Sequence, residues 1–223
     1  MGLNVIMMGP PGAGKGTQAG RFAHERGLIK VSTGDILREA IKEKNPTALA
    51  AKARMDRGDL VDDAMIIAIV EERLGRPDAD PGFVLDGFPR TVAQAQALDE
   101  IVERLENGPL IIVDVAVPEQ ELVRRLASRR ICGVCGTNAD ALGSATSCTK
   151  CGGDLVQRAD DDQGVVRERL RVYQHATRPV LEYYRARPTF RVVNGAQAPE
   201  RVARELDTMI DDAASEMSAE RAR

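Results

Sequence analysis

The stretch Gly9-Pro10-Pro11-Gly12-Ala13-Gly14-Lys15-Gly16-Thr17 follows an apolar run at residues 3–8 and precedes a helical pattern. Its four glycines allow backbone N–H groups to converge on phosphate oxygens without interference from Cβ atoms. A helix that begins near Gly14 adds partial positive charge, and Lys15 can reach the outer phosphates of a nucleotide. The stretch therefore predicts a binding site for a nucleoside triphosphate.

One position departs from the usual phosphate-binding loop, in which Ser or Thr directly follows the lysine. Here Gly16 follows Lys15, and the hydroxyl group belongs to Thr17. The order of apolar strand, glycine-rich loop and helix is nevertheless the order that this mechanism requires. An ordinary Gly/Pro turn is the alternative interpretation.

The composition limits the class of protein. The 223 residues are 43% hydrophobic and carry a formal net charge of −3, so the chain can form a substantial core and has no overall basic excess for nucleic acid. No segment approaches the roughly 18 continuous apolar residues of a membrane span, and the N-terminus does not resemble a signal peptide. We therefore expect a cytoplasmic, soluble monomer without nucleic-acid or membrane partners.

Short apolar runs alternate with helical patterns, which predicts an α/β fold with a five-stranded parallel sheet covered by helices. The expected strands are residues 3–8, 29–31, 83–85, 110–117 and 190–193, and the expected helices are residues 14–26, 34–44, 47–57, 62–74, 91–106, 119–130, 163–187 and 199–213. The nearly continuous apolar run 110–117 is typical of a central strand buried on both faces. Pro179 should interrupt the long helix, and residues 215–223 should fray.

Two stretches do not follow this alternation. Residues 32–61 contain two helical patterns without a strand directly after them, which indicates a helical insertion. Residues 128–162 have almost no apolar periodicity and contain all four cysteines, which indicates a second insertion. The core is then formed by residues 1–31, 62–127 and 163–223.

The cysteines form two C-x2-C pairs, Cys132/Cys135 and Cys148/Cys151, separated by twelve residues. Four thiolates at this spacing can close a tetrahedral Zn²⁺ site, and they leave no open position for catalysis. Metal ligation would also supply folding free energy that so polar a loop lacks. We therefore expect structural zinc. The alternatives are two small disulfides, disfavoured in the cytosol, and a redox pair, disfavoured because no thioredoxin-like helix follows.

Polar residues follow the second and third expected strands. Asp86 comes at the carboxyl end of the third strand, where parallel sheets bind ligands, and can face Mg²⁺; a turn-capping role is the alternative. Arg90 carries a planar guanidinium that matches phosphate oxygens. Ser32 or Thr33 can cap the next helix or contact a ligand, and Arg38 lies one turn into that helix.

Four further arginines, Arg125, Arg129, Arg158 and Arg169, flank the cysteine loop on both sides. Arginines at such spacing usually form a solvated helix face, but a closing loop can carry them onto phosphates.

Together these motifs resemble those of adenylate kinases, specifically the long form with a zinc-binding lid, and the resemblance covers essentially the whole chain. The matching segments are residues 9–17, 32–35, 86–90, 129–130 and 158–161. The order Lys15-Gly16-Thr17 is the usual form in that family. The resemblance implies a P-loop three-layer fold and reversible, Mg²⁺-dependent transfer of a phosphoryl group from ATP to AMP, giving two ADP. It also implies that residues 32–61 bind AMP and that residues 128–162 form the lid.

The resemblance assigns roles residue by residue. The residues implied for ATP are Gly12, Ala13, Gly14, Lys15, Gly16 and Thr17 at its phosphates, and Arg125 and Gln197 at its adenine. The residues implied for AMP are Thr33, Arg38, Gly58, Asp59, Leu60, Val61, Gly87, Phe88, Pro89, Arg90 and Gln94. The catalytic residues implied are Lys15, Asp86, Arg90, Arg125, Arg129, Arg158 and Arg169; Arg158 and Arg169 also contact substrate, and Asp160 and Asp161 orient the arginines.

Two segments depart from the family pattern. The loop 136–143 between the cysteine pairs is short and has no aromatic residue, which removes the expected aromatic contacts of the lid. Residues 162–165 replace a more acidic, Thr-containing start of the long helix, so the lid hinge is expected to be looser or differently capped. Other functions consistent with the sequence are a kinase for another nucleoside monophosphate and a non-catalytic, nucleotide-binding zinc protein.

Overall fold

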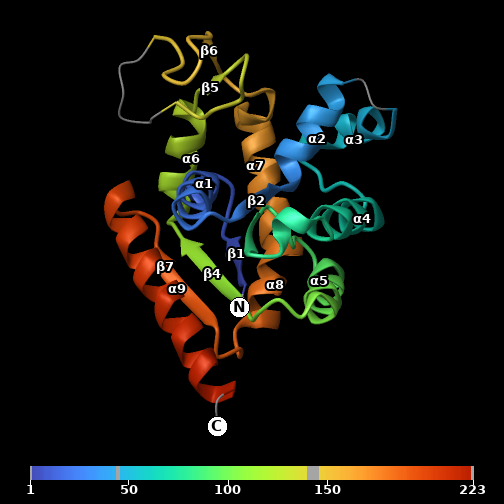
Figure 1. Ribbon diagram of the computed structural model, residues 1–223. Coiled ribbons are helices and arrows are strands. Elements are labelled where there is room, and N and C mark those ends of the chain that lie inside the picture. The colour runs from blue at the N-terminus through green and yellow to red at the C-terminus, as the bar shows by residue number, and fades with distance from the viewer. Residues whose placement is uncertain (1, 44–45, 140–145, 222–223) are drawn as a thin grey trace.

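The computed structural model describes residues 2–43, 46–139 and 146–221 of the chain. Its main sheet has five strands in the order β2-β3-β1-β4-β7, and all neighbouring strands run parallel (Figure 1). The strands are β1 (Leu3–Met8), β2 (Ile29–Ser32), β3 (Gly82–Asp86), β4 (Leu110–Ala116) and β7 (Phe190–Asn194). The predicted five-stranded parallel sheet is therefore confirmed.

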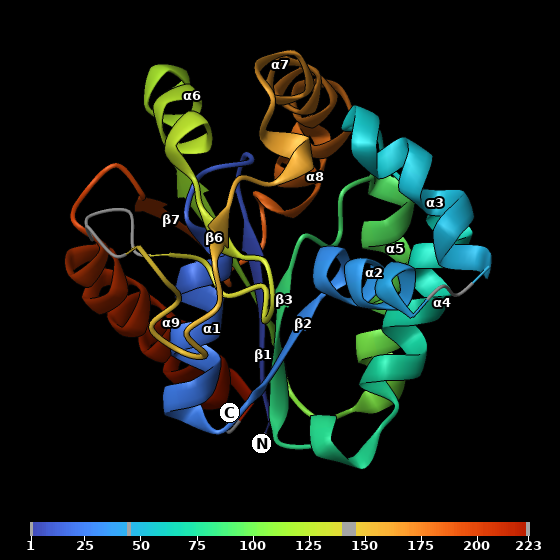
Figure 2. The same ribbon diagram turned by 90° about the horizontal axis from the view of Figure 1, so that it is seen from above.

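Helices cover both faces of this sheet, as Figure 2 shows from above. They are α1 (Lys15–Arg26), α2 (Thr33–Lys42), α3 (Pro46–Arg57), α4 (Asp63–Leu74), α5 (Val92–Leu105), α6 (Glu119–Ser128), α7 (Gln163–Val172), α8 (Arg178–Tyr184) and α9 (Pro199–Arg221). The described fold also contains two short 3-10 helices, η1 (Pro77–Ala79) and η2 (Ala159–Asp161), and a small antiparallel pair, β5 (Ile131–Cys132) and β6 (Leu155–Val156). Within the described ranges, no helix has both the length and the apolarity of a membrane span.

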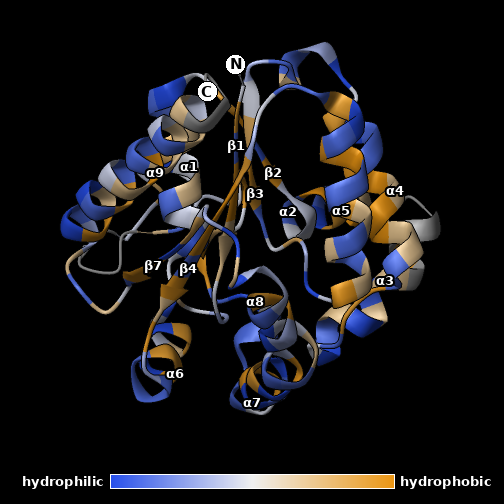
Figure 3. Ribbon diagram, turned by 90° about the horizontal axis from the view of Figure 1, so that it is seen from below, coloured by the Kyte–Doolittle hydropathy of each residue, from blue (hydrophilic) through white to orange (hydrophobic). Residues whose placement is uncertain are grey.

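The middle strand, β1, divides the core into two layers because successive side chains of a strand point to opposite faces. Ile6 and Met8 pack with residues of α4, α5 and α8, whereas Val5 and Met7 pack with residues of α1, α6, α7 and α9. Figure 3 shows the same division, with hydrophobic strands between helices whose outer surfaces are largely hydrophilic. The sheet is thus buried on both faces, and polar groups can gather only at its edges and ends.

The apolar run 110–117 forms β4, an interior strand between β1 and β7. Its residues Leu110, Ile111, Ile112 and Val113 are all buried. The prediction of a strand covered on both faces is confirmed, and β1 is the strand in the middle of the sheet.

The long helix predicted at residues 163–187 is interrupted, as Pro179 suggested. A π-helical turn, Tyr173–Thr177, separates α7 from α8. Proline has no N–H to donate to the preceding turn, and its ring crowds the carbonyl there. The wider turn accommodates both effects and leaves α8 packed on the core through buried Val180, Leu181 and Tyr184.

The prediction that residues 215–223 fray is wrong for the residues described there, because α9 continues as a helix to Arg221. Ala213 is fully buried in the core, and Glu216 forms an ion pair with Arg191 of β7 at 2.6 Å. These two contacts hold this part of α9 to the core and to β7.

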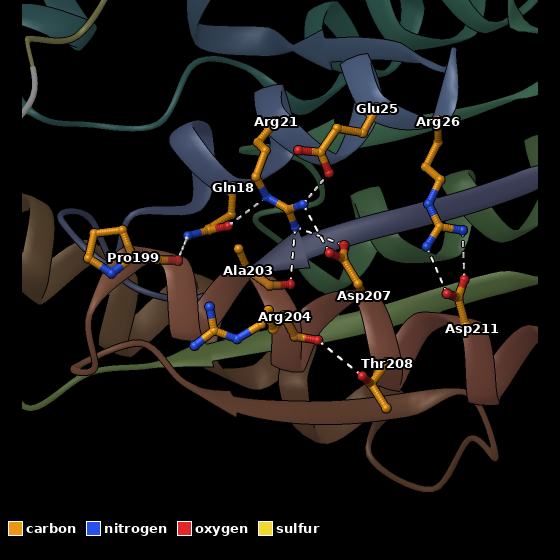
Figure 4. A network of polar contacts seen from close by, with 10 residues as sticks. All are labelled: Gln18, Arg21, Glu25, Arg26, Pro199, Ala203, Arg204, Asp207, Thr208 and Asp211. Carbon is orange, nitrogen blue, oxygen red and sulfur yellow. Dashed lines mark hydrogen bonds and ion pairs between the residues drawn. The ribbon is translucent and has the colours of Figure 1, made fainter.

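A network of ion pairs joins α9 to α1 (Figure 4). Arg21 donates to both carboxylate oxygens of Asp207, at 2.8 and 3.0 Å, and to the carbonyl of Ala203 at 3.1 Å. Arg26 pairs with Asp211 through two hydrogen bonds of 2.7 Å. The helix that follows the glycine-rich loop is therefore fixed to the C-terminal helix along its length.

We predict that Arg21→Ala lowers the free energy of unfolding by about 1–2 kcal/mol, because it removes a partly buried, bidentate ion pair. Urea denaturation followed by circular dichroism measures this change. Arg76→Ala is the matched control, since Arg76 pairs with Glu72 on an exposed helix surface. Equal losses in the two variants would contradict the prediction.

Candidate active site

The glycine-rich loop lies between the end of β1 and the start of α1. Gly9, Gly12 and Gly14 all have positive φ angles, of 130°, 84° and 91°. A Cβ atom on Gly9 would lie 2.6 Å from the carbonyl oxygen of Val115, and one on Gly12 would lie 2.9 Å from Leu126 Cγ. Gly14 is the N-cap of α1 and has no side chain to cover the first amides of the helix. These amides are available to an anion, as the sequence predicts.

Lys15 extends back across this loop. Its Nζ donates a hydrogen bond to the carbonyl oxygen of Pro10 at 2.8 Å. Burial is the main reason that the pKa of Lys15 is lowered to about 8, and Asp86 opposes the shift. The guanidinium groups of Arg90, Arg169 and Arg129 lower it further. Lys15 therefore lies among several cations in the folded protein.

A second group of polar side chains gathers after β2 and β3. Thr33 Oγ1 and Arg90 Nε both donate to the carbonyl oxygen of Gly87, at 3.0 and 2.7 Å. Gln94 Oε1 accepts from the backbone N–H of Arg90 at 2.8 Å. Arg38 of α2 forms an ion pair with Asp35. Thr33 is thus brought together with Arg90 and Gln94, which are more than fifty residues further along the sequence.

The sequence left open whether Ser32 or Thr33 caps α2, and the two hydroxyl groups make different contacts in the structure. Ser32 is the N-cap, and its Oγ accepts from the backbone N–H of Asp35 at 3.3 Å. Thr33 instead directs its hydroxyl group to Gly87. The capping interpretation is therefore correct for Ser32.

The arginines that flank the cysteine loop meet at two aspartates. Asp161, almost fully buried, pairs with Arg129 and with Arg169, the latter at 3.1 Å. Asp160 pairs with Arg158 at 3.1 Å and with Arg169 at 3.0 Å. Burial lowers the pKa of Arg158 to about 10, and the nearby charge of Arg38 is the next largest cause of this shift. Arg158 therefore lies close enough to Arg38 for the two charges to interact.

Arg125 lies outside that group. Its Nη1 donates to the carbonyl oxygen of Gly195 at 3.0 Å, and its Nε pairs with Glu121 at 2.8 Å. Gln197, two residues after Gly195, donates to Glu205 at 2.7 Å. Arg125 thus contacts the loop between β7 and α9 to which Gln197 belongs, apart from the two aspartates.

The turn after α3 lies against the start of α7. A Cβ atom on Gly58 would lie 2.7 Å from Arg169 Cγ, and Gly58 has a positive φ angle of 84°. Asp59 pairs with Arg57, and Val61 packs into the core beside α4. The carbonyl oxygen of Leu60 accepts a hydrogen bond from Arg54. The helical insertion is therefore in contact with the arginine group.

The four cysteine sulfurs lie within 4.8 Å of one another. All four are free thiols, so the disulfide alternative does not hold. The Sγ atoms of Cys132 and Cys151 are 3.4 Å apart and those of Cys135 and Cys148 are 3.6 Å apart. Zn–S bonds of about 2.3 Å in a tetrahedron require S···S distances of roughly 3.8 Å. The thiols are thus arranged for one tetrahedral metal ion, and loop residues 140–145 lie outside the described part of the chain.

Comparisons with known proteins agree with this geometry. A sequence model of the family described as adenylate kinase matches residues 7–189. A protein named adenylate kinase from Archaeoglobus fulgidus is 45% identical over 213 residues, which cover 94% of this chain and 98% of that protein. The chain belongs to the adenylate kinase family. Proteins of the same name from Bacillus subtilis and Geobacillus sp. are 45% and 44% identical, over 87% and 93% of this chain and 92% and 98% of their own lengths.

The structure also explains the glycine that replaces the Ser or Thr of the simple loop pattern in this adenylate kinase family member. A Cβ atom on Gly16 would lie 2.9 Å from Asp86 Oδ2 and 3.7 Å from Lys30 Nζ. Any larger residue at this position would displace the carboxylate. Gly16 therefore leaves room for the carboxylate of Asp86, which lies at the end of β3.

Two residues of this adenylate kinase family site were missed by the sequence analysis. Asp63 accepts hydrogen bonds from Thr91 and from Gln94, at 2.8 and 2.7 Å, and so holds the Gln94 amide. Lys30 contacts Asp86 from β2. A lysine within a strand of a buried sheet was the available indication for Lys30, whereas Asp63 looked like an ordinary first-turn acidic residue.

We predict that Gly16→Ala lowers the kcat of the adenylate kinase reaction by about tenfold to a hundredfold, because displacement of Asp86 by even 1 Å disturbs a site that works by positioning. Steady-state kinetics and a thermal melt measure activity and folding. Gly20→Ala is the matched control, since a Cβ atom there would meet nothing within 4 Å. A Gly16→Ala variant as active as Gly20→Ala would show that the close approach has no functional importance.

Proposed function

We propose that the protein catalyses reversible, Mg²⁺-dependent transfer of a phosphoryl group from ATP to AMP, giving two ADP. The observation that carries this proposal is that positively charged side chains come together in one place. Lys15 lies near Arg90, Arg129 and Arg169, and Arg158 lies near Arg38. Cations gathered in this way attract a polyanion such as the phosphates of a nucleotide. The family assignment and the names of the relatives favour AMP over another nucleoside monophosphate as the acceptor.

On the ATP side, the first amides of α1 and Lys15 bind the phosphates. The residues proposed for this role are Gly12, Ala13, Gly14, Lys15, Gly16 and Thr17. Arg125 and Gln197 border the adenine, which is supported by the hydrogen bond from Arg125 to Gly195 in the loop that contains Gln197. The carboxylate of Asp86 is a hard oxygen donor next to the loop, so it suits Mg²⁺ held through water. When bound, Mg²⁺ would reduce the negative charge on the phosphates.

On the AMP side, Arg38 and Arg90 bind the phosphate, and Thr33 and Gln94 line the remainder of the site. The hydrogen bonds from Thr33 and Arg90 to Gly87, and from Gln94 to Asp63, support this assignment because they fix each side chain. The backbone around the nucleoside is assigned to Gly58, Asp59, Leu60, Val61, Gly87, Phe88 and Pro89.

The reaction needs no general base in the protein. The second pKa of a phosphate monoester is about 6, so the acceptor oxygen of AMP is already ionised at neutral pH. His24 and His175 are both exposed on helices and remain outside the proposed chemistry. The chain contributes in-line positioning and positive charge around a loose transition state, through Lys15 and the arginines.

Two insertions are proposed to close over the core: residues 32–61 on the AMP side and residues 128–162 as the lid, with residues 1–31, 62–127 and 163–223 as the core. Closure would exclude water as a competing acceptor. Asp160 and Asp161 hold the arginines of the hinge in place, and Asp162 caps α7 by accepting from Gly164 N–H at 2.9 Å. We also propose that the protein is a monomer and that it is located in the cytoplasm.

One coupled assay tests the function directly. Purified protein is given ATP with AMP, GMP, UMP or CMP in turn, and the formation of diphosphate is followed. We expect turnover with AMP well above that with the other three. Preference for another monophosphate would identify a different kinase of this class, and nucleotide binding without turnover would identify a non-catalytic protein.

We predict that Lys15→Met lowers kcat/KM for ATP by about 10²–10³-fold with the fold preserved, because it removes charge matched to the transition state. In the unmodified protein, Lys15 is protonated below its pKa of about 8 and neutral above it. The value of kcat/KM for ATP should therefore fall as the pH rises through about 8. Lys52→Met on an exposed helix surface is the control. Near-native turnover of Lys15→Met would refute the assignment.

We propose that the four cysteines hold structural Zn²⁺ that stabilises the lid. Metal analysis should give about one zinc per chain, and Cys148→Ser should lower the thermal midpoint more than it lowers kcat. Thr149→Ala, an exposed residue of the same turn, is the control. Protein purified without chelator that contains no zinc would contradict the proposal.

A further inference from the structure

Lys30 lies between the two sides of the proposed site, and none of the roles above includes it. It is part of β2, where it pairs in register with Val84 of β3. Its side chain is 26% exposed, which is unusual for a lysine because such side chains normally extend into solvent. The reason for this position lies in its contacts.

The ammonium group of Lys30 contacts three different elements. It donates to the carbonyl oxygen of Gly16 in the first turn of α1 at 3.2 Å. It lies 3.6 Å from Asp86 Oδ2 at the end of β3 and 3.7 Å from Asp35 Oδ2 in the first turn of α2. One cation therefore contacts both the carboxylate proposed for Mg²⁺ and a carboxylate of the AMP side.

Asp35 is shared between two cations. Its Oδ1 pairs with Arg38, the arginine proposed for the AMP phosphate, and its Oδ2 faces Lys30. Burial alone would raise the pKa of Asp35, but the hydrogen bond and charge of Arg38 and the charge of Lys30 outweigh burial and lower it. Asp35 is thus ionised at neutral pH. When either Arg38 or Lys30 moves away, the carboxylate attracts the remaining cation more strongly.

We propose that Lys30 is a positioning residue that couples AMP binding to divalent-cation binding at Asp86, an inference that rests on the proposed function. The phosphate of AMP draws Arg38 away from Asp35. Lys30 then moves towards Asp35 and away from Asp86. The Asp86 carboxylate, relieved of a competing positive charge, binds the hydrated cation more tightly. Because linkage is reciprocal, the cation also strengthens AMP binding.

The coupling gives the site an order of assembly. Without AMP, Lys30 neutralises Asp86 and weakens the hold on the metal–ATP complex. With AMP present, the Lys30 ammonium pairs with Asp35 on the AMP side instead. Full charge at Asp86 is therefore available when both substrates are bound, which disfavours transfer of the phosphoryl group to water.

The test uses Mn²⁺ as the probe and measures its free concentration by electron paramagnetic resonance, in the presence of the full-length chain and a non-hydrolysable β,γ-imido analogue of ATP. We expect AMP to tighten the apparent Kd for Mn²⁺ by about fivefold or more in the unmodified protein. In Lys30→Gln, Mn²⁺ should bind tightly even without AMP, and AMP should change the Kd by less than twofold.

Two further variants separate coupling from general damage. Asp35→Asn removes the negative charge that attracts Lys30 away from Asp86. Mn²⁺ should therefore bind weakly with or without AMP. Lys52→Gln, which alters an exposed pair with Asp56, should keep the coupling of the unmodified protein. Circular dichroism establishes that each variant is folded, and Asp35→Asn still tests the proposal if Lys30→Gln does not fold.

The proposal is overturned if AMP has no effect on Mn²⁺ binding in the unmodified protein, or if Lys30→Gln retains the full effect. These failures are distinct from failure of the proposed function. Absence of AMP phosphorylation in the coupled assay would refute the function, whereas normal turnover with unaltered coupling in Lys30→Gln would refute only the role of Lys30.

Discussion

Repulsion among the cations around Lys15 is the constraint on which the site depends. Arg129, Arg158 and Arg169 would not remain close together without Asp160 and Asp161, which pair with all three. Burial is the main reason that the pKa values of Lys15 and Arg158 are lowered, and the charges of neighbouring arginines lower both further. The folded site therefore gathers positive charge that can bind phosphate groups. This is the property that a phosphoryl-transfer site requires.

The sheet makes this concentration of charge possible. Its two faces are filled by apolar layers, so the polar residues of different strands collect at the carboxyl ends. The glycine-rich loop follows β1, Ser32 and Thr33 follow β2, and Asp86 ends β3. In the strand order of this sheet, β3 lies between β1 and β2, which places Asp86 between the glycine-rich loop and the start of α2. Lys30 and Gly16 then approach Asp86 from either neighbour.

Much of the fold and site was predictable because the relevant patterns are local. Strand, loop and helix around Lys15 follow from apolar runs and glycine spacing, and the cysteine pairs follow from their own spacing. Thr33, Arg90 and Gln94 were identified by resemblance, and the fold brings them together. Asp63 was missed because its carboxylate acts on Gln94 of another helix, and no local pattern records that contact.

The sequence by itself determined the order of elements, the phosphate-binding loop and the chemical types of the site residues, because each depends on neighbours within a few positions. Only the tertiary structure decided the rest. Helix α9 continues to Arg221, against the prediction of fraying, and Ala213 and Glu216 contact the core and Arg191. Gly16 lies close to Asp86, and three elements distant in sequence present oxygen atoms to the ammonium group of Lys30. Such contacts depend on how the strands are ordered in space, which no single stretch of sequence specifies.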